Sequence, residues 1–258
     1  MSQARAISAV LLTGATGSIG SALARAYAAP GVTLFLQGRK VAQLELIAQQ
    51  CQTRGAVVQT AAFDLREREQ LSQWLKSVCG QTVPDLLIVN AGINIHGGPS
   101  NSGENWLEVE ALLEVNIRAA LATVNGVLPF MRQRGYGQIA LISSLAAYHG
   151  LPMTPSYCAS KAALKAYGEG LRSWLAGEGV KVNVVMPGYV ESAMCDDMPG
   201  PKPFLWGAEK AAQTIKYGLE RNKARISFPF PLNLGTWFLA VLPAGISQRL
   251  LRLFGYAA

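Results

Sequence analysis

The stretch Thr13-Gly14-Ala15-Thr16-Gly17-Ser18-Ile19-Gly20 decides how this chain folds. It follows a short apolar run at residues 6–12 and precedes a helical pattern, which is the order strand, turn, helix. Its three glycines allow a tight turn and a close approach to a pyrophosphate, and the amides that open a helix attract such an anion. We therefore interpret this turn as a site for the phosphates of a dinucleotide.

Further strand-like runs alternate with helical stretches along the chain. They lie at residues 32–36, 56–61, 85–89, 138–142 and 180–185. This alternation predicts an α/β fold, a Rossmann-like doubly wound parallel sheet with helices on both faces, in three layers α/β/α. No linker, repeat or low-complexity segment interrupts it, so we expect a single domain over residues 1–258.

The composition supports a large buried core. The 258 residues are 50% hydrophobic and 15% charged, which excludes a disordered chain. The first apolar run leads at once into a turn and a helix, so we interpret it as a buried strand and not as a signal peptide. The net charge of +7 is spread without a dense run, which favours a solvated basic surface over nucleic-acid binding.

The cysteines and histidines indicate no metal site. Cys51, Cys79, Cys158 and Cys195 lack metal-ligand spacing, which favours reduced thiols in a cytoplasmic protein. His96 and His149 are the two histidines, too few for a histidine-rich zinc site. We therefore expect no metal.

The end of the second predicted strand bears on cofactor choice. An NAD site usually has an acidic residue here for the ribose hydroxyls, but this chain has Gly38-Arg39-Lys40. The planar, permanently charged side chain of Arg39 suits a 2′-phosphate, which favours NADP(H) over NAD(H). Asp64, after the third predicted strand, is a candidate acceptor for the adenine amino group or a helix cap.

Tyr157 and Lys161 form a candidate catalytic pair, with Ser144 thirteen positions before the tyrosine. Residues four apart share a face of a helix, so phenol and ammonium can reach one site. A free tyrosine has a pKa near ~10, and a nearby cation lowers it toward the range in which proton transfer is efficient.

These features together resemble the short-chain dehydrogenase/reductase family, in its single-domain type of ~250 residues. The resemblance extends from Thr13 to about Ser192. Its motifs occur in the right order: the glycine turn, Asp64, Asn90-Ala91-Gly92, Asn116, Ser144, Tyr157 with Lys161, and Pro187-Gly188. One departure is Ser18, which stands where the family usually has its second glycine, so the spacing Gly14-x-x-Gly17-x-x-Gly20 is that of the family's longer members.

The resemblance implies a role for each matched position. Tyr157 is the acid that protonates the carbonyl oxygen in reduction and the base in oxidation. Lys161 lowers the pKa of Tyr157 and holds the nicotinamide ribose, Ser144 binds the substrate oxygen, and Asn116 holds a water between Lys161 and solvent. Asn90 braces the strand ends. The implied cofactor-binding residues are Gly14, Thr16, Gly17, Ser18, Ile19, Gly20, Arg39, Asp64, Leu65, Asn90, Ala91, Gly92, Tyr157, Lys161, Pro187, Gly188, Val190 and Ser192.

The catalytic helix has its own start signal. Thr154-Pro155 offers a capping hydroxyl and then a proline at the first helical position. In the family this helix and its predecessor, around residues 110–134, pair across subunits, so the resemblance implies a homodimer or homotetramer. Packing within the subunit is the alternative.

The substrate contacts are expected from residues 93–99, 145–155 and 193–207. The last segment carries Phe204, Leu205 and Trp206 and is interpreted as a substrate lid with an apolar inner face, or alternatively as a covered loop. Residues 229–258 form an apolar, proline-containing extension, whose apolar stretch at residues 228–243 is too short to span a bilayer comfortably. It is interpreted as a peripheral membrane contact or as packing on the sheet, lid or partner subunit.

The resulting functional hypothesis is an NADPH-dependent carbonyl reductase or alcohol dehydrogenase that acts on a small-molecule substrate, which can be hydrophobic. A non-catalytic NADP(H)-binding or sensor protein is the first alternative. A sugar-nucleotide epimerase of the same family is the second, because the Gly17 spacing allows it. The expected location is the cytoplasm; association with a membrane through the C-terminal extension is the alternative.

Overall fold

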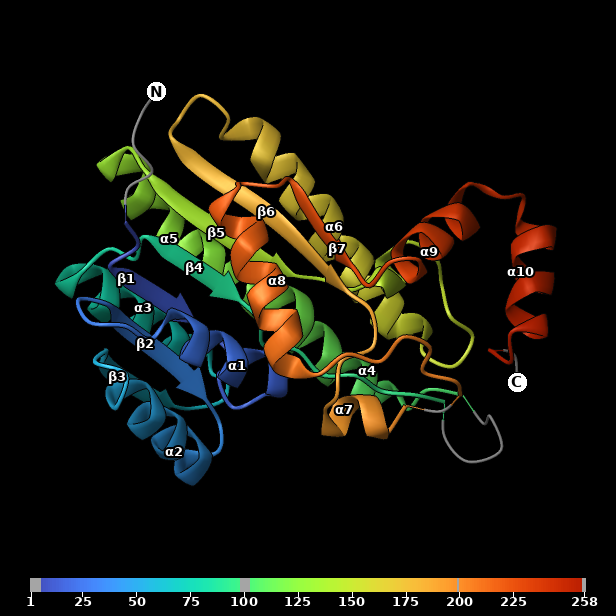
Figure 1. Ribbon diagram of the computed structural model, residues 1–258, viewed down its shortest axis with the longest axis horizontal. Coiled ribbons are helices and arrows are strands. Elements are labelled where there is room, and N and C mark those ends of the chain that lie inside the picture. Colours follow the sequence, from blue (N-terminus) through green and yellow to red (C-terminus); the bar gives the residue numbers. More distant parts are fainter. Residues whose placement is uncertain (1–5, 98–102, 199, 257–258) are drawn as a thin grey trace.

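The computed structural model describes residues 6–97, 103–198 and 200–256. Within those ranges seven parallel strands form one sheet in the order β3-β2-β1-β4-β5-β6-β7 (Figure 1). The strands are β1 (Ala9–Leu12), β2 (Thr33–Gly38), β3 (Val57–Ala62), β4 (Leu86–Val89), β5 (Gly137–Ile142), β6 (Val180–Pro187) and β7 (Arg225–Phe228). The predicted doubly wound parallel sheet is thus confirmed.

Helices cover both faces of the sheet. They are α1 (Ser18–Tyr27), α2 (Val41–Gln52), α3 (Arg68–Gln81), α4 (Trp106–Leu113), α5 (Ala120–Arg134), α6 (Pro155–Trp174), α7 (Ala193–Asp196), α8 (Ala208–Glu220), α9 (Leu232–Val241) and α10 (Ala244–Leu253). A π-helical turn, η2 (Glu114–Ala119), joins α4 to α5, and a 3₁₀ turn, η3 (Leu145–Ala147), follows β5.

The core has two halves, one on each face of the sheet. On β1, Val10 and Leu12 pack with α1, α2 and α8, whereas Ala9 and Leu11 pack with α3, α5 and α6. This alternation follows from the two-residue period of a strand. Because both faces are covered, the central strands read as unbroken apolar runs, such as Leu86–Val89.

The order of strands fixes where a ligand can bind. β1 and β4 are neighbours, but the chain proceeds from β1 toward β3 and from β4 toward β7. The crevice at such a reversal is the usual ligand site of a doubly wound sheet. Asn90 follows β4 and joins the two strand ends, because its backbone N–H donates to Thr13 Oγ1 at 3.1 Å and its amide to Gly14 O at 3.0 Å.

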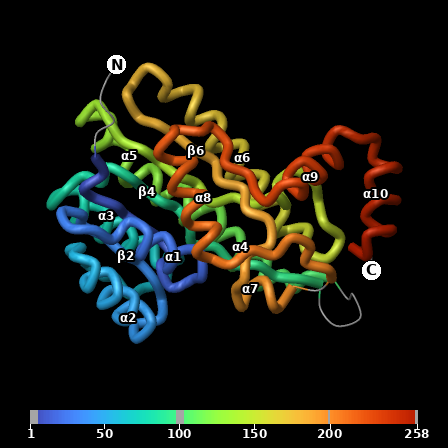
Figure 2. The backbone as a smooth tube through the Cα atoms, viewed as in Figure 1, coloured from blue at the N-terminus to red at the C-terminus, as the bar shows by residue number. Residues whose placement is uncertain are grey.

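The C-terminal region differs from the sequence-based expectation. Residues 225–228 form a seventh strand that was not predicted, and the apolar extension folds into α9 and α10. Figures 1 and 2 place these two helices at the end of the molecule opposite α2. Within the described residues, Trp106–Arg134 is the one helical stretch long and apolar enough to cross a membrane, and half of its most apolar window is buried inside the protein.

Candidate active site

The glycine turn after β1 has the geometry of a phosphate cradle. Gly14 has a φ of 66°, and a Cβ there would lie 2.7 Å from the Cα of Ala91. A Cβ on Gly20 would lie 2.2 Å from Gly14 O, whereas one on Gly17 would meet that atom at 3.5 Å. Only glycine therefore fits at positions 14 and 20, and the first turn of α1 starts at Ser18 with its amides beside the turn.

One cavity of about 1330 Å³ runs from this turn to the C-terminal helices. It contains nearly every residue predicted for the site: Gly14, Thr16, Gly17, Ser18, Ile19, Gly20, Arg39, Asp64, Leu65, Asn90, Ala91, Gly92, Ser144, Tyr157, Lys161, Pro187, Gly188, Val190 and Ser192. Of the predicted catalytic and cofactor-binding residues, Asn116 alone does not line it. Its volume exceeds that of the usual single-ligand pocket of roughly 300–1,000 Å³ and leaves room for a dinucleotide together with a substrate.

The end of the cavity near β2 is basic. Arg39 is exposed and its guanidinium lies 3.8 Å from the Asp64 carboxylate. Asp64 is mainly bound to Arg66, from which it accepts a backbone hydrogen bond at 2.9 Å, and this partner lowers the pKa of Asp64. Asp64 therefore shapes the turn before α3 and does not cap that helix, whose N-cap is Glu67.

Gln37, Gly38, Lys40 and Gln43, in and just after β2, belong to this end and were not predicted. Gln37 accepts from the Gly14 backbone N–H at 3.1 Å and donates to Phe63 O at 2.7 Å, so it fixes the glycine turn. Lys40 and Gln43 also line the cavity. The signal for Lys40 was its place directly after Arg39, where a second cation reinforces an anion site.

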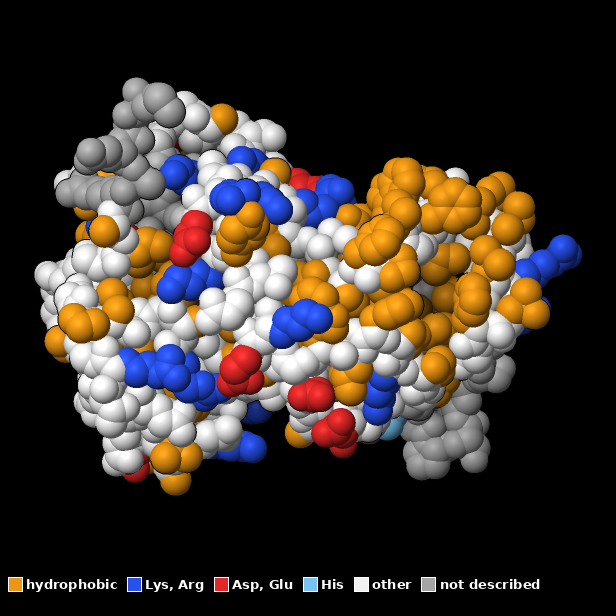
Figure 3. Space-filling view, in the orientation of Figure 1, with side chains coloured by type: hydrophobic (Ala, Val, Ile, Leu, Met, Phe, Trp, Pro, Cys, Tyr) orange, Lys and Arg blue, Asp and Glu red, His pale blue; other side chains and the backbone are white. Residues whose placement is uncertain are grey.

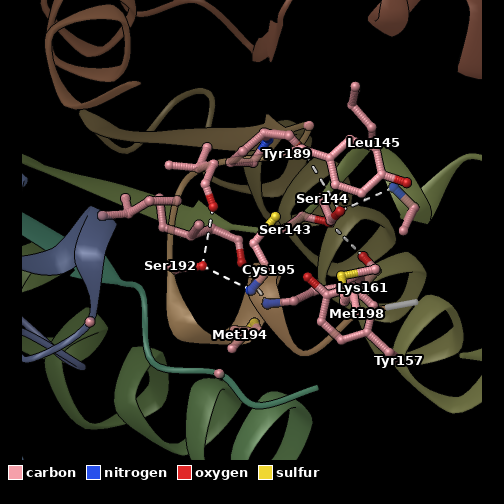
Figure 4. A pocket seen from close by; sticks show the side chains of 18 of the residues that line it. Ser143, Ser144, Leu145, Tyr157, Lys161, Tyr189, Ser192, Met194, Cys195 and Met198 are labelled. Atoms are coloured by element: carbon pink, nitrogen blue, oxygen red, sulfur yellow. Dashed lines mark hydrogen bonds between the residues drawn. The ribbon is translucent and has the colours of Figure 1, made fainter. Parts of the chain in front are cut away.

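Tyr157, Lys161 and Ser144 meet in the middle of the cavity. Figure 4 shows them among the side chains that line it. Tyr157 and Lys161 come from α6, and the Lys161 ammonium lies 5.6 Å from the centroid of the Tyr157 ring. Lys161 is buried and donates to Ile142 O at 3.1 Å. Ser144 lies two residues after β5, where its Oγ caps η3 by accepting from Ala146 N at 3.1 Å.

Burial governs the pKa values of the pair. It raises the pKa of Tyr157 to about 12, and a hydrogen bond with the Ser144 hydroxyl acts in the opposite direction. Burial lowers the pKa of Lys161 to about 8. The expectation that Lys161 brings the pKa of Tyr157 below its free value is therefore wrong for the protein groups alone, because desolvation of the phenolate dominates.

Asn116 lies behind the cavity wall, inside the π-helical turn η2. Its Oδ1 accepts from Ile93 N at 2.8 Å, and its Nδ2 donates to Ile93 O at 2.9 Å and to Ser160 Oγ at 3.0 Å. It thereby joins the segment after β4 to α6. A Cβ on Gly92 would lie 3.1 Å from Lys161 Nζ and 3.2 Å from Asn116 Oδ1. Lys161 and Asn116 therefore both pack against the backbone at Gly92.

The start of α6 differs in detail from the prediction. Pro155 is at the first helical positions, as expected, but the Thr154 hydroxyl makes no cap. Its Oγ1 lies instead within hydrogen-bond distance of Asn94 Oδ1 and Ile95 O, 2.7 Å from each. The carboxylate of Glu104 accepts from Ser156 N at 3.1 Å and so binds a free backbone N–H at the start of α6. A carboxylate 52 positions away in sequence could not be recognised from local capping patterns.

The predicted substrate segments contribute unevenly. Residues 98 and 99 of the first segment and residue 199 of the lid lie outside the described residues. His149 lines the cavity and His96 does not. In the segment predicted as a lid, Ala193, Met194, Cys195, Met198, Pro201, Pro203 and Phe204 line it. Trp206 does not, because its ring stacks on Phe228 with centroids 5.1 Å apart.

The nearby polar and sulfur groups are engaged locally. Ser192 Oγ donates to Val190 O at 3.1 Å and accepts from Cys195 N at 3.0 Å, which caps α7. Cys158 is buried and its sulfur accepts from Leu151 N, in agreement with a packing role. Among the described residues no three His, Cys, Asp or Glu side chains gather into a metal-like cluster.

The far wall of the cavity comes from the C-terminal extension, none of whose residues was named among the predicted site residues. Pro231, Leu232, Leu234, Gly235, Thr236, Phe238, Leu239, Leu250, Leu251, Phe254 and Tyr256 line it. The Tyr256 hydroxyl donates to Pro201 O at 3.2 Å and accepts from Tyr189 Oη at 3.3 Å. The end of the chain is thereby joined to the lid segment across the cavity.

Known proteins are similar to this chain in both sequence and fold. The family described as short chain dehydrogenase matches residues 8–200. An uncharacterized oxidoreductase of Myxococcus xanthus is 34% identical over 235 residues, which cover 90% of this chain and 92% of that protein. A ketoacyl reductase of Nostoc, HetN, is 35% identical over 200 residues, 77% of this chain and 69% of that protein.

Solved structures agree with the fold. A short-chain dehydrogenase from Sphingobium yanoikuyae in complex with NADPH has a TM-score of 0.80 at 23% identity and covers 95% of this chain and 94% of its own. A bulky-bulky ketone specific alcohol dehydrogenase from Comamonas testosteroni has a TM-score of 0.78 at 20% identity, with 98% and 96% covered.

Proposed function

This chain belongs to the short-chain dehydrogenase family of oxidoreductases, and on that premise we propose that it is an NADPH-dependent carbonyl reductase or alcohol dehydrogenase. The observation that carries the proposal is the convergence of Tyr157, Lys161 and Ser144 on the cavity that begins at the glycine turn. Such a convergence of a proton donor, a cation and a hydroxyl suits proton transfer to a carbonyl oxygen.

The residues present fit a dinucleotide. Gly14 and Gly20 have no space for a side chain, so their backbone is open to close approach beside the N-terminus of α1. A dinucleotide held at this turn would supply the hydride of the reaction. Residues from the ends of β1, β4 and β6 line the cavity around it, among them Asn90 and Pro187.

The protein groups perform the proton chemistry. The Ser144 hydroxyl donates a hydrogen bond to the substrate oxygen and orients the carbonyl. Tyr157, protonated at neutral pH because burial raises its pKa to about 12, gives its proton to the same oxygen as the carbonyl is reduced. The Lys161 ammonium stabilises the phenolate that remains. In alcohol oxidation the same groups act in reverse.

The basic end of the cavity supports a preference for NADP(H). Arg39 offers a planar fork to a 2′-phosphate, and Lys40 adds a second positive charge at the same wall. Asp64 leaves part of the Arg39 guanidinium free, since the two groups are 3.8 Å apart and Asp64 is held by Arg66.

The substrate side of the cavity favours an apolar carbonyl compound. The lining residues of the lid and the C-terminal extension include Met194, Met198, Phe204, Leu232, Leu239 and Leu250, and none of those described there is charged. An apolar wall rewards burial of apolar substrate surface, and His149 and Thr236 offer isolated polar contacts. We assign residues 193–207 as a lid whose closure excludes water.

Homo-oligomerisation through α4, α5 and α6 belongs to the same proposal. Trp106 and Leu107 on α4 are 65% and 73% exposed, and Trp174 at the end of α6 is 62% exposed. Large apolar side chains that remain at the surface of such helices suit a subunit interface.

The direct test is oxidation of NADPH by the purified protein with a panel of aliphatic, aromatic and acyl ketones, with NADH as comparison. We expect turnover with NADPH that improves from small polar ketones to apolar ones. NADPH binding without turnover of any carbonyl or alcohol on the panel contradicts the proposal and supports a non-catalytic binding protein.

A further inference from the structure

The C-terminal helices expose a concentrated apolar surface. Large side chains that stand 45–81% exposed include Phe230, Trp237, Val241, Ile246, Leu253 and Phe254. α9 has no buried residue. Figure 3 shows hydrophobic side chains gathered over the end of the molecule where α9 and α10 lie. A surface of this kind on a folded protein marks a site of interaction.

The charges of this region select the partner. After Glu220 the chain contains no acidic residue, whereas it contains Arg221, Lys223, Arg225, Arg249 and Arg252. Arg249 and Arg252 lie on α10 and are exposed. Their guanidinium groups make no ion pair with any residue that the structure describes. Exposed apolar side chains next to unpaired basic ones match an anionic lipid surface.

The dimensions of the helices indicate how they would meet such a surface. α9 and α10 each have ten residues, so each is about 15 Å long, half of a hydrocarbon core of ~30 Å. Neither helix can span a bilayer. Their apolar side chains suit helices that lie in the plane of the membrane–water interface. Trp237 would then lie at the depth of the lipid headgroups, where tryptophan is enriched.

We propose that the α9–α10 hairpin, residues 230–254, docks the protein on an anionic lipid surface. Leu234, Phe238 and Phe254 are exposed and also line the catalytic cavity, so the docking surface and the cavity wall are the same two helices. An apolar substrate dissolved in the lipid then has a short path to Tyr157. Docking itself does not depend on the proposed reaction, since the exposed side chains lie outside the catalytic groups.

Flotation of the full-length protein with vesicles tests docking. Vesicles of phosphatidylcholine with phosphatidylglycerol are compared with vesicles of phosphatidylcholine alone. The apolar variant combines Trp237→Ser, Val241→Ser and Leu253→Ser, which are exposed positions that do not line the cavity. The matched control combines Leu46→Ser and Val57→Ser, which are 54% and 60% exposed on α2 and β3. Far-ultraviolet circular dichroism and NADPH binding verify that both variants are folded.

We expect the intact protein and the control to float with anionic vesicles and the apolar variant to bind at least about tenfold more weakly. Arg249→Gln with Arg252→Gln should weaken binding to anionic vesicles by roughly fivefold for each arginine. Salt should weaken binding of the intact protein in the same way.

The proposal is overturned if the intact protein fails to float with anionic vesicles. It is also overturned if the control and the apolar variant bind equally well. A second copy of the chain as the true partner gives a distinct result: no vesicle binding, and a smaller species in size-exclusion chromatography for the apolar variant alone. Because no arm measures turnover, a failure here is distinguishable from a failure of the proposed reaction.

Discussion

The Lys161 ammonium lies 5.6 Å from the centroid of the Tyr157 ring and donates to the backbone carbonyl of Ile142. The carbonyl belongs to β5 and both side chains to α6, so this hydrogen bond joins α6 to the sheet. Lys161 is thus held at the tyrosine by the fold. Its charge is also costly there, because the side chain is 4% exposed and burial lowers its pKa to about 8.

This pKa predicts the pH dependence of reduction. With a pKa of about 12, Tyr157 stays protonated through the neutral range, whereas Lys161 loses its charge as pH rises through about 8. We expect kcat/KM for carbonyl reduction to be level below about pH 8 and to fall above it. Alcohol oxidation needs the phenolate and should rise with pH. Profiles in both directions check this, and reduction that accelerates between about pH 8 and 10 contradicts it.

Cofactor choice depends on Arg39. Replacement by Gln removes charge-assisted hydrogen bonds worth about 1.5–3 kcal/mol, so KM for NADPH should rise about 10–100-fold. KM for NADH should change little, because NADH has no 2′-phosphate. Steady-state kinetics with both cofactors measure this. Arg68→Gln is the control, since Arg68 is 70% exposed and outside the cavity; equal losses for NADH and NADPH in Arg39→Gln refute the assignment.

The glycine turn should tolerate one substitution and reject another. In Gly20→Ala the new Cβ meets Gly14 O at 2.2 Å, so the turn must shift, and we expect a loss of about 1–3 kcal/mol in the free energy of unfolding with weaker NADPH binding. In Gly17→Ala the same atom is 3.5 Å away, so stability should be kept. Chemical denaturation of both variants tests the difference, and equal stability contradicts the geometry.

Asn116 is expected to act on the site through structure. Its replacement by Ala leaves Ile93 N and Ile93 O without their side-chain partner, which costs about 1–3 kcal/mol of unfolding free energy. We also expect a lower kcat, since α6 loses its link at Ser160. Asn125→Ala, at an exposed position on α5, is the control. If Asn116→Ala is as stable as the control Asn125→Ala, this role is contradicted.

The sequence predicted the sheet, and which residues gather at its carboxyl edge, for identifiable reasons. The central strands are buried on both faces, so they appear in the sequence as continuous apolar runs without alternating polar residues. The residues at their carboxyl ends, such as Gly14 and Asn90, are adjacent in space because parallel strands end at one edge. Local patterns therefore sufficed to place them in one cavity.

The remaining parts depend on contacts between distant residues. The far wall of the cavity is α9 and α10, whose apolar residues in sequence fit a core, a subunit interface or a membrane equally well. Glu104 accepts a hydrogen bond from Ser156 at the start of α6, which is 52 positions away in sequence. Gln37 accepts one from Gly14 in the glycine turn, 23 positions away. The pKa of Tyr157 depends on burial, which spacing on a helix does not determine.

The central claim is that Tyr157 carries the proton for a hydride-transfer reaction, and Tyr157→Phe tests it most directly. The substitution removes one hydroxyl and keeps the ring. Single-turnover measurements with NADPH and an apolar ketone, beside NADPH binding by fluorescence titration, separate chemistry from binding. We predict that reduction falls by at least about 100-fold while NADPH affinity stays within about threefold. Full reduction activity in Tyr157→Phe would contradict the account.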